Sequence, residues 1–176
     1  KLPKSKIDSL YISEDIPKDD LIGIFESQVL SRHIDLSARK YKEKGICHYT
    51  ISSSGHEGNA VFGNIFPLSD MAFLHYRSGA FFLERSKKLP GSTPIFDTAL
   101  SLVASKDDPI SSGRHKVYGS KELNIPPQTS TIASHLPKAV GFAFSIDRGR
   151  DLKLKDNVVN NDSVVLCSFG DAGINH

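Results

Sequence analysis

The stretch VVLCSFGDAG, residues 164–173, decides the fold class. Its first four residues are apolar and two of them are β-branched valines, which is typical of a buried strand. The glycines at positions 170 and 173 predict a turn at the carboxyl end of that strand. Because ligands of α/β domains bind beyond the carboxyl ends of the strands, this turn is a candidate binding site.

A second apolar run, residues 71–74, predicts another short buried strand, which is followed by His75, Tyr76 and Arg77. Apolar residues at helical spacing predict helices over residues 21–45, 55–66, 96–104 and 132–146, and another through residues 81–83. Helices that alternate with a few buried strands indicate the α/β class, with a parallel sheet flanked by helices.

The helix signals make specific predictions. Asp19 and Asp20 suit a helix amino terminus, and Gly45 should end the same helix. Ser54 and Glu57 have the spacing of a capping box for the second helix. The long first helix should be amphipathic, with its apolar face formed by Ile24, Phe25, Val29, Leu30, Ile34, Ala38 and Tyr41.

The helix over residues 132–146 carries Pro137, which predicts a kink or a break. Its small residues predict close packing against a neighbour; they are Ala133, Ala139, Gly141 and Ala143.

Three segments lack helical or strand signals. Residues 1–18 are polar with two prolines and predict an extended lead-in, and residues 147–162 form a charged connector. Residues 105–127 predict a long loop, which in a compact domain is usually functional or mobile. We expect residues 19–176 to be one unit, the amino-terminal part of a cofactor-binding domain that is truncated after the Gly-Asp-x-Gly motif.

Composition excludes several classes of protein. The chain has 176 residues, with 22 basic and 20 acidic side chains and no long run of like charge, which argues against nucleic acid as a partner. No apolar stretch reaches the ~20 residues that a membrane span needs. Cys47 and Cys167 stand alone, so we expect reduced, buried, structural thiols. The seven histidines form no His-x-x-x-His pair, which argues against zinc.

The two strand ends carry complementary chemistry. Arg77 offers a planar cation for phosphate oxygens, and the Tyr76 hydroxyl can donate to the same group. Asp171 offers a hard carboxylate oxygen of the kind that Mg²⁺ binds. Together they indicate a magnesium diphosphate cofactor, while an ion-paired arginine and a plain turn stay open as alternatives.

Five motifs in order carry a resemblance to a known family: SSSGHEGNAVFG, FLHYRSGAFFLERS, SGRHKVYGS, TSTIASHLPKAVGFAFS and VVLCSFGDAG. Residues 31–176 resemble the amino-terminal half of the alpha subunit of thiamine-diphosphate-dependent 2-oxo acid dehydrogenases. This family includes the pyruvate and branched-chain enzymes, and acetoin dehydrogenase shares the pattern. The resemblance implies the thiamine-diphosphate-binding fold, present as an incomplete part.

The resemblance assigns cofactor-binding roles. It implies that Tyr76 and Arg77 bind the diphosphate and that Ser130 and Ile132 lie against the aminopyrimidine. Asp171 would be a ligand of Mg²⁺. Its neighbours in the motif are Gly170 and Ala172, the second of which replaces the family's second glycine.

The resemblance also brings weaker candidates for catalysis. His56 lies in a family motif close to the active site, although it equally well begins a capped helix. Arg114 and His115 fall near a segment that lines the entrance to the active site. His135 and Lys138 are expected to be polar residues on a helix face, with no catalytic role.

The implied reaction is oxidative decarboxylation of a 2-oxo acid, with transfer of the acyl group to a lipoyl group on a dihydrolipoyl acyltransferase. A beta subunit, or a later part of the same polypeptide, would supply the glutamate that activates the cofactor, so this chain alone is expected to be inactive. Acetoin dehydrogenase, another thiamine-diphosphate enzyme and a non-catalytic interaction module stay open as alternatives. We expect a cytoplasmic location, with the mitochondrial matrix as the alternative.

Overall fold

The computed structural model of the chain describes residues 16–48, 50–114, 117–154 and 162–175. Residues 1–15 of the predicted lead-in 1–18 and residues 155–161 of the predicted connector 147–162 therefore lie outside the described residues. The elements, in chain order, are α2 (Lys18–Glu43), η1 (Glu57–Asn59), α3 (Ala60–Ile65), β1 (Met71–Phe73), α4 (Gly79–Ser86), α5 (Pro94–Leu102), α6 (Leu136–Asp151), β2 (Val165–Cys167) and η2 (Asp171–Gly173).

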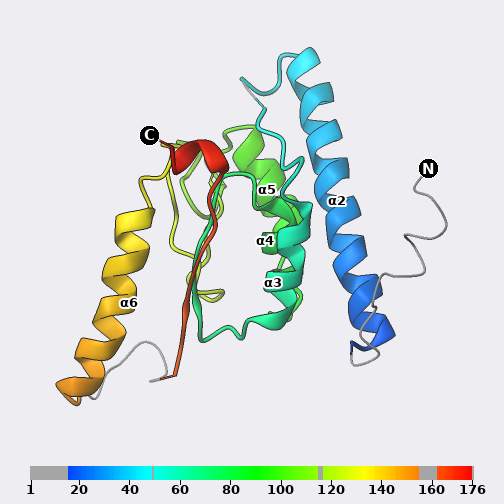
Figure 1. Ribbon diagram of the computed structural model, residues 1–176. Coiled ribbons are helices and arrows are strands. Elements are labelled where there is room, and N and C mark those ends of the chain that lie inside the picture. The colour runs from blue at the N-terminus through cyan, green and yellow to red at the C-terminus, as the bar shows by residue number, and fades with distance from the viewer. Residues whose placement is uncertain (1–15, 49, 115–116, 155–161, 176) are drawn as a thin grey trace.

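The two predicted strands pair with each other in parallel. Met71 lies opposite Val165 and Phe73 opposite Cys167, although the strands are 94 residues apart in the chain. In Figure 1, α6 lies on one side of the strands, α3 and α4 lie on the other, and α2 packs outside α4. The structure thus combines helices with a small parallel two-stranded sheet, which is compatible with the α/β class.

The main core lies between β1, α4 and the segment that precedes α6. Its buried members are Ala72, Leu74, Phe81, Phe82, Tyr118, Leu123 and Ile125. The last three come from the predicted loop 105–127. This segment also pairs with the sheet, because the Ala72 amide donates to the Asn124 carbonyl at 2.9 Å. Residues 118–125 of the predicted loop therefore contribute to the core, which the polar composition of the loop did not reveal.

The predicted apolar face of α2 is confirmed at Ile24 and Ala38, which are buried, and wrong at Phe25, Val29 and Tyr41. Phe25 and Val29 are exposed, while the buried face carries Ser27, Ser31 and Asp35 between Ile24 and Ala38. The reason is polar pairing across the interface. Ser27 donates to Glu84 of α4 at 2.6 Å, and Asp35 accepts from the segment before η1.

The predicted ends of the first two helices have different outcomes. Gly45 adopts a left-handed φ of 70° just beyond α2, as the stop signal requires. The capping box is wrong: Glu57 accepts from the Gly55 amide at 2.7 Å, but no side chain caps the turn. As a result a 3₁₀ turn comes first, and α3 begins only at Ala60.

Pro137 lies in the first turn of α6, which begins at Leu136 and not at the predicted residue 132, so the proline marks the start of the helix and not a kink within it. It occupies the first turn, where the missing amide proton has no helical partner in any case, and the helix continues to Asp151 within the predicted connector. Of the small residues, Ala139 is buried against Met71 and Phe73, as expected. Gly141 is exposed, and an added β-carbon there would meet no atom within 4 Å, so the predicted close packing is wrong at this position.

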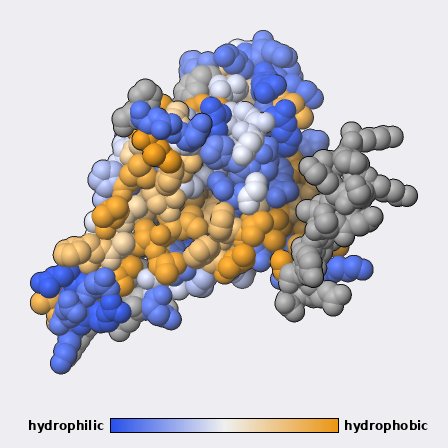
Figure 2. All heavy atoms as spheres, viewed as in Figure 1, coloured by the Kyte–Doolittle hydropathy of each residue, from blue (hydrophilic) through white to orange (hydrophobic). Residues whose placement is uncertain are grey.

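Apolar side chains gather on the face that α6, β2 and α3 present in Figure 2. Among the exposed ones are Val140 and Phe144 on α6, Val164 before β2, and Phe62 and Ile65 on α3. No described helix is both long and apolar enough to cross a membrane. Cys47 is buried and Cys167 half-buried, and both are free thiols.

Candidate functional site

The two strand ends are joined by the hydroxyl of Ser168, which follows β2. The His75 amide donates to Ser168 Oγ at 2.8 Å, and the Ser168 amide donates to the Phe73 carbonyl at 3.0 Å. Ser78 Oγ lies 3.0 Å from the same hydroxyl. The segments that carry the two predicted motifs therefore leave the sheet side by side.

Tyr76 and Arg77 lie half-buried at the end of β1, as predicted for a pair that could hold an anion. Arg77 Nη1 donates to the Ser52 carbonyl at 2.5 Å, and the guanidinium carbon lies 5.2 Å from the centre of the Tyr76 ring. These two contacts fix the direction of the side chain. Within the described residues, Arg77 Nε and Nη2 form no hydrogen bond and could serve a ligand.

The Gly-Asp-Ala-Gly motif forms η2 directly beyond β2, as a turn. Asp171 and Ala172 are exposed, and the Asp171 carboxylate accepts no hydrogen bond from the described residues. Neither glycine of the motif has a positive φ, and only Gly173 lies in a tight environment. A β-carbon at Gly170 would lie 3.6 Å from His75 Nε2, and one at Gly173 would lie 3.3 Å from Ile132 Cγ2.

Ile132 therefore meets the motif after β2, so the structure joins three segments that the sequence singled out. Ile132 is exposed and Ser130 is half-buried on the segment that leads into α6. Arg114 behaves differently. It lies exposed on a distinct loop, where Nη1 donates to the Ser111 carbonyl at 3.5 Å, and it makes no contact with the predicted site in the described part of the chain. His115 lies outside the described residues.

His56 and His75 stack with ring centres 4.8 Å apart and an angle of 9° between the planes. Burial, helped by His56, Arg77 and His135, lowers the pKa of His75 to about 4. Burial and Arg77 also lower the pKa of His56, against an opposing pull from Glu57 and Asp171. At neutral pH both rings are uncharged, and His56 lies within the electrostatic reach of both predicted motifs.

His135 is a site residue whose position sequence reasoning missed. It is buried just before α6, and its Nε2 lies 2.7 Å from the Ser168 carbonyl. Because a carbonyl can only accept, Nε2 carries the proton. The expected position on a helix face is wrong for His135, which is buried just before α6, whereas Lys138 lies on α6 and is exposed. No spacing in the sequence marks His135, since its partner is 33 residues away.

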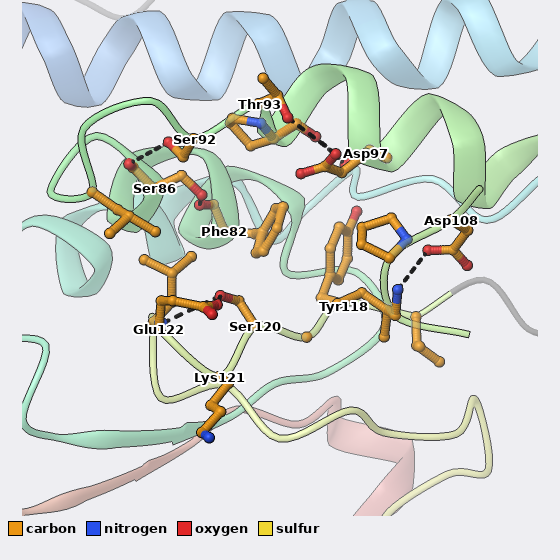
Figure 3. A pocket seen from close by; sticks show the side chains of 18 of the residues that line it. Phe82, Ser86, Ser92, Thr93, Asp97, Asp108, Tyr118, Ser120, Lys121 and Glu122 are labelled. Carbon is orange, nitrogen blue, oxygen red and sulfur yellow. Dashed lines mark hydrogen bonds between the residues drawn. The ribbon is translucent and has the colours of Figure 1, made fainter. Parts of the chain in front are cut away.

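Two cavities are lined in part by residues of α4. One of about 260 Å³ opens beside His56 and is walled by Phe62, Leu166, Ser168 and Phe169, so it is mainly apolar and adjoins the strand ends. A larger one of about 380 Å³ lies between α4, α5 and residues 117–123, with Phe82 and Tyr118 forming its aromatic wall (Figure 3). None of the described residues that the sequence marked as a candidate lines this larger cavity.

The donor set fits a diphosphate with a magnesium ion. Arg77 has two nitrogens available for phosphate oxygens, and the Asp171 carboxylate is accessible. The described residues contain no group of three or more metal-ligating side chains. Mg²⁺ needs only one or two protein carboxylates, because phosphate and water complete its shell.

Comparison with known proteins gives distant similarity to one kind of enzyme subunit. No family profile matches the chain. The chain is 25% identical over 164 residues to proteins named "2-oxoisovalerate dehydrogenase subunit alpha, mitochondrial" from Homo sapiens and Pan troglodytes. The Mus musculus protein of the same name is 25% identical over 169 residues. The alignment covers 90% of this chain but only 33% of each of these relatives. The chain is thus distantly similar to the alpha subunit of a branched-chain 2-oxo acid dehydrogenase.

Proposed function

We propose that this chain forms the diphosphate-binding part of a thiamine-diphosphate-dependent 2-oxo acid dehydrogenase. The observation that supports the proposal is that the segment with Tyr76 and Arg77 and the segment with Asp171 leave the same edge of a parallel strand pair, where a hydrogen bond from the His75 amide to Ser168 joins them. The distant similarity to 2-oxoisovalerate dehydrogenase alpha subunits supports a branched-chain 2-oxo acid as substrate. The residues involved lie where α/β domains bind ligands.

In this proposal each residue has a binding role. Arg77 and Tyr76 hold the diphosphate, with Arg77 directed by the Ser52 carbonyl. Asp171 binds Mg²⁺, and Gly170 and Ala172 shape the turn that presents it. Ser130 and Ile132 lie against the aminopyrimidine. When bound, the cofactor stabilises the negative charge that forms as carbon dioxide leaves the substrate.

His56 has a different role from the residues that bind the cofactor. It lines the apolar cavity beside the strand ends and is uncharged at neutral pH, so it can donate one hydrogen bond to a substrate without adding charge. Arg114 has no such setting and is left without a role.

The proposed partners are a beta subunit or a further part of the same polypeptide, and the dihydrolipoyl acyltransferase that accepts the acyl group. Residues 19–176 would then be part of one cofactor-binding domain. The relatives are named as mitochondrial proteins, which favours the matrix over the cytoplasm. The exposed apolar face of α6, β2 and α3 favours a protein partner, and it is also what a non-catalytic interaction module would present.

The test uses the natural gene product that contains this chain, purified with its partner subunit. Carbon dioxide release is measured from 3-methyl-2-oxobutanoate and pyruvate, and acetaldehyde release from acetoin, each with and without thiamine diphosphate and Mg²⁺. We expect release from the branched 2-oxo acid that requires both additions and acylates a lipoyl domain. Activity on acetoin alone would assign the alternative enzyme, and complete inactivity would favour the interaction module.

A further inference from the structure

Asp35 is a buried carboxylate in the middle of α2, with 7% of its surface exposed. Its Oδ2 accepts from Ser52 Oγ at 2.8 Å and from the Ser53 amide at 2.9 Å. Burying a carboxylate is costly unless hydrogen bonds compensate for lost water. Both of these bonds go to one short segment of chain, residues 52–53.

That segment is what holds Arg77. The Ser52 carbonyl accepts from Arg77 Nη1 at 2.5 Å, and the guanidinium is thereby kept over the Tyr76 ring. Asp35 thus connects to Arg77 through a single residue, since it binds the side chain of Ser52 while Arg77 binds the carbonyl. Asp35, Ser52 and Arg77 also line one polar cavity of about 270 Å³.

Glu84 provides a matched case within the same fold. It is a buried carboxylate on α4 that accepts from Ser27 of α2 at 2.6 Å and from Asn64 at 3.1 Å. It therefore ties α2 to its neighbours much as Asp35 does. In the described part of the chain it forms no hydrogen bond with residues 52–53 or Arg77. A substitution of Glu84 therefore shows the effect of weakening the packing of α2 without disturbing Arg77.

We propose that Asp35 is a positioning residue for the diphosphate site, because it fixes Ser52 so that the carbonyl directs Arg77 toward the ligand. This inference rests on the proposed function and extends it to a residue of a different helix. Loss of Asp35 would free the 52–53 segment and with it the guanidinium, while the arginine itself remained.

A double-mutant cycle on the natural gene product with its partner tests the proposal. Isothermal titration measures the dissociation constant of thiamine diphosphate with Mg²⁺ for the wild type, Asp35→Ala, Arg77→Ala and the double variant. Asp35→Ala should weaken binding by about tenfold, as for loss of one charge-assisted contact, and should have little further effect once Arg77 is absent. Glu84→Gln should bind the cofactor as the wild type does.

The outcomes are distinct. An Asp35→Ala effect of equal size in both backgrounds, or no effect, would overturn the inference, because a positioning residue acts only through its target. If Asp35→Ala does not fold, Ser52→Ala removes one of the two bonds but keeps the carbonyl, and it should give a smaller loss that again vanishes without Arg77. Failure of the wild type to bind would instead refute the proposed function.

Discussion

Arg85 is completely buried, and its guanidinium serves the backbone. Nε donates to the Leu123 carbonyl at 2.8 Å and Nη2 to the Asp70 carbonyl at 2.5 Å, while the ring of Phe81 lies 5.7 Å away. Burial lowers the pKa of Arg85, with a partial opposing effect from Asp70, but an arginine stays charged at neutral pH. One side chain thus joins α4 to the ends of two loops.

Arg85→Met should destabilise the fold by about 3 kcal/mol, because buried carbonyls lose their donor. Arg148→Met is the matched control. The Arg148 guanidinium is exposed and forms a surface ion pair with Asp151 at 3.8 Å, so the substitution should lower the free energy of unfolding by less than ~0.5 kcal/mol. Urea unfolding of both variants measures this. Equal losses would show that the Arg85 contacts contribute no more than a surface pair.

His75 makes stability depend on pH. Its folded pKa of about 4 lies below the ordinary value of 6.5, so the unfolded chain binds a proton more readily between these values. The stability that depends on neutral His75 is complete above about pH 6.5 and declines as the pH falls toward 4. We expect His75→Gln to remove up to ~3 kcal/mol of this pH dependence.

Unfolding followed from pH 7 to pH 4 tests the prediction for His75, with His33→Gln as control. His33 is exposed on α2, so its replacement should leave the curve parallel to that of the wild type. If the curve of His75→Gln is also parallel to that of the wild type, the His75 ring is protonated as easily in the folded as in the unfolded chain, and the prediction is wrong.

At this scale the sequence predicts residues whose chemistry is local. Tyr76, Arg77 and Asp171 follow directly from strands that can be recognised by composition. Ser52, Ser168 and His135 do not, because each acts through contacts with distant segments of the chain. A serine or histidine looks the same in the sequence whether or not such a partner exists.

The helices α3 and α4 pack closely against each other, and Gly63 makes this close packing possible. A β-carbon at Gly63 of α3 would lie 2.8 Å from the Phe81 carbonyl oxygen and 3.1 Å from Glu84 Cβ. Both neighbours belong to α4, and the backbone atom cannot move aside without displacing the helix. The contact places α3, and with it His56 just before η1, against the helix that follows Arg77.

Gly63→Ala should destabilise the fold by about 1–3 kcal/mol, since overpacking outweighs the gain in helix propensity. Gly141→Ala makes the same change inside α6, where the added methyl meets nothing, and should stabilise by about 0.5–1 kcal/mol. Thermal or urea unfolding gives both values. Stabilisation by both substitutions would contradict the close approach of α3 to α4.

The elements also show where periodicity fails as a guide. Helical spacing located α2 correctly, but the choice of buried face assumed that apolar residues point inward. Ser27 and Asp35 are buried because Glu84 and the 52–53 segment offer matching partners. Such pairing is a property of two elements together, so one helix pattern could not reveal it.

The whole molecule presents an apolar face over α6, β2 and α3 (Figure 2). Val140 and Phe144 of α6 are 70% and 66% exposed. Contiguous apolar surface of this kind favours association. The full extent of this apolar face was not predicted. Which side of the strand pair remains uncovered depends on how β1 and β2 pair, and these strands lie 94 residues apart in the chain.

Replacing Val140 and Phe144 together by lysine should reduce self-association of the isolated chain in sedimentation velocity. The unfolding free energy should change by less than ~0.5 kcal/mol, as for exposed positions. Ala139→Lys, one residue from Val140 but buried beside Phe73, should instead prevent stable folding. A large loss from the exposed pair would mean that α6 packs by the opposite face.

The central claim, a magnesium diphosphate site made by two strand ends, is tested most directly by calorimetric titration of thiamine diphosphate into the natural gene product with its partner. We expect binding that requires Mg²⁺ and is lost in Asp171→Ala. In Arg77→Ala the dissociation constant should rise at least tenfold, because one charged contact with the diphosphate is removed. Binding that is independent of Mg²⁺, or unchanged by both substitutions, would contradict the account.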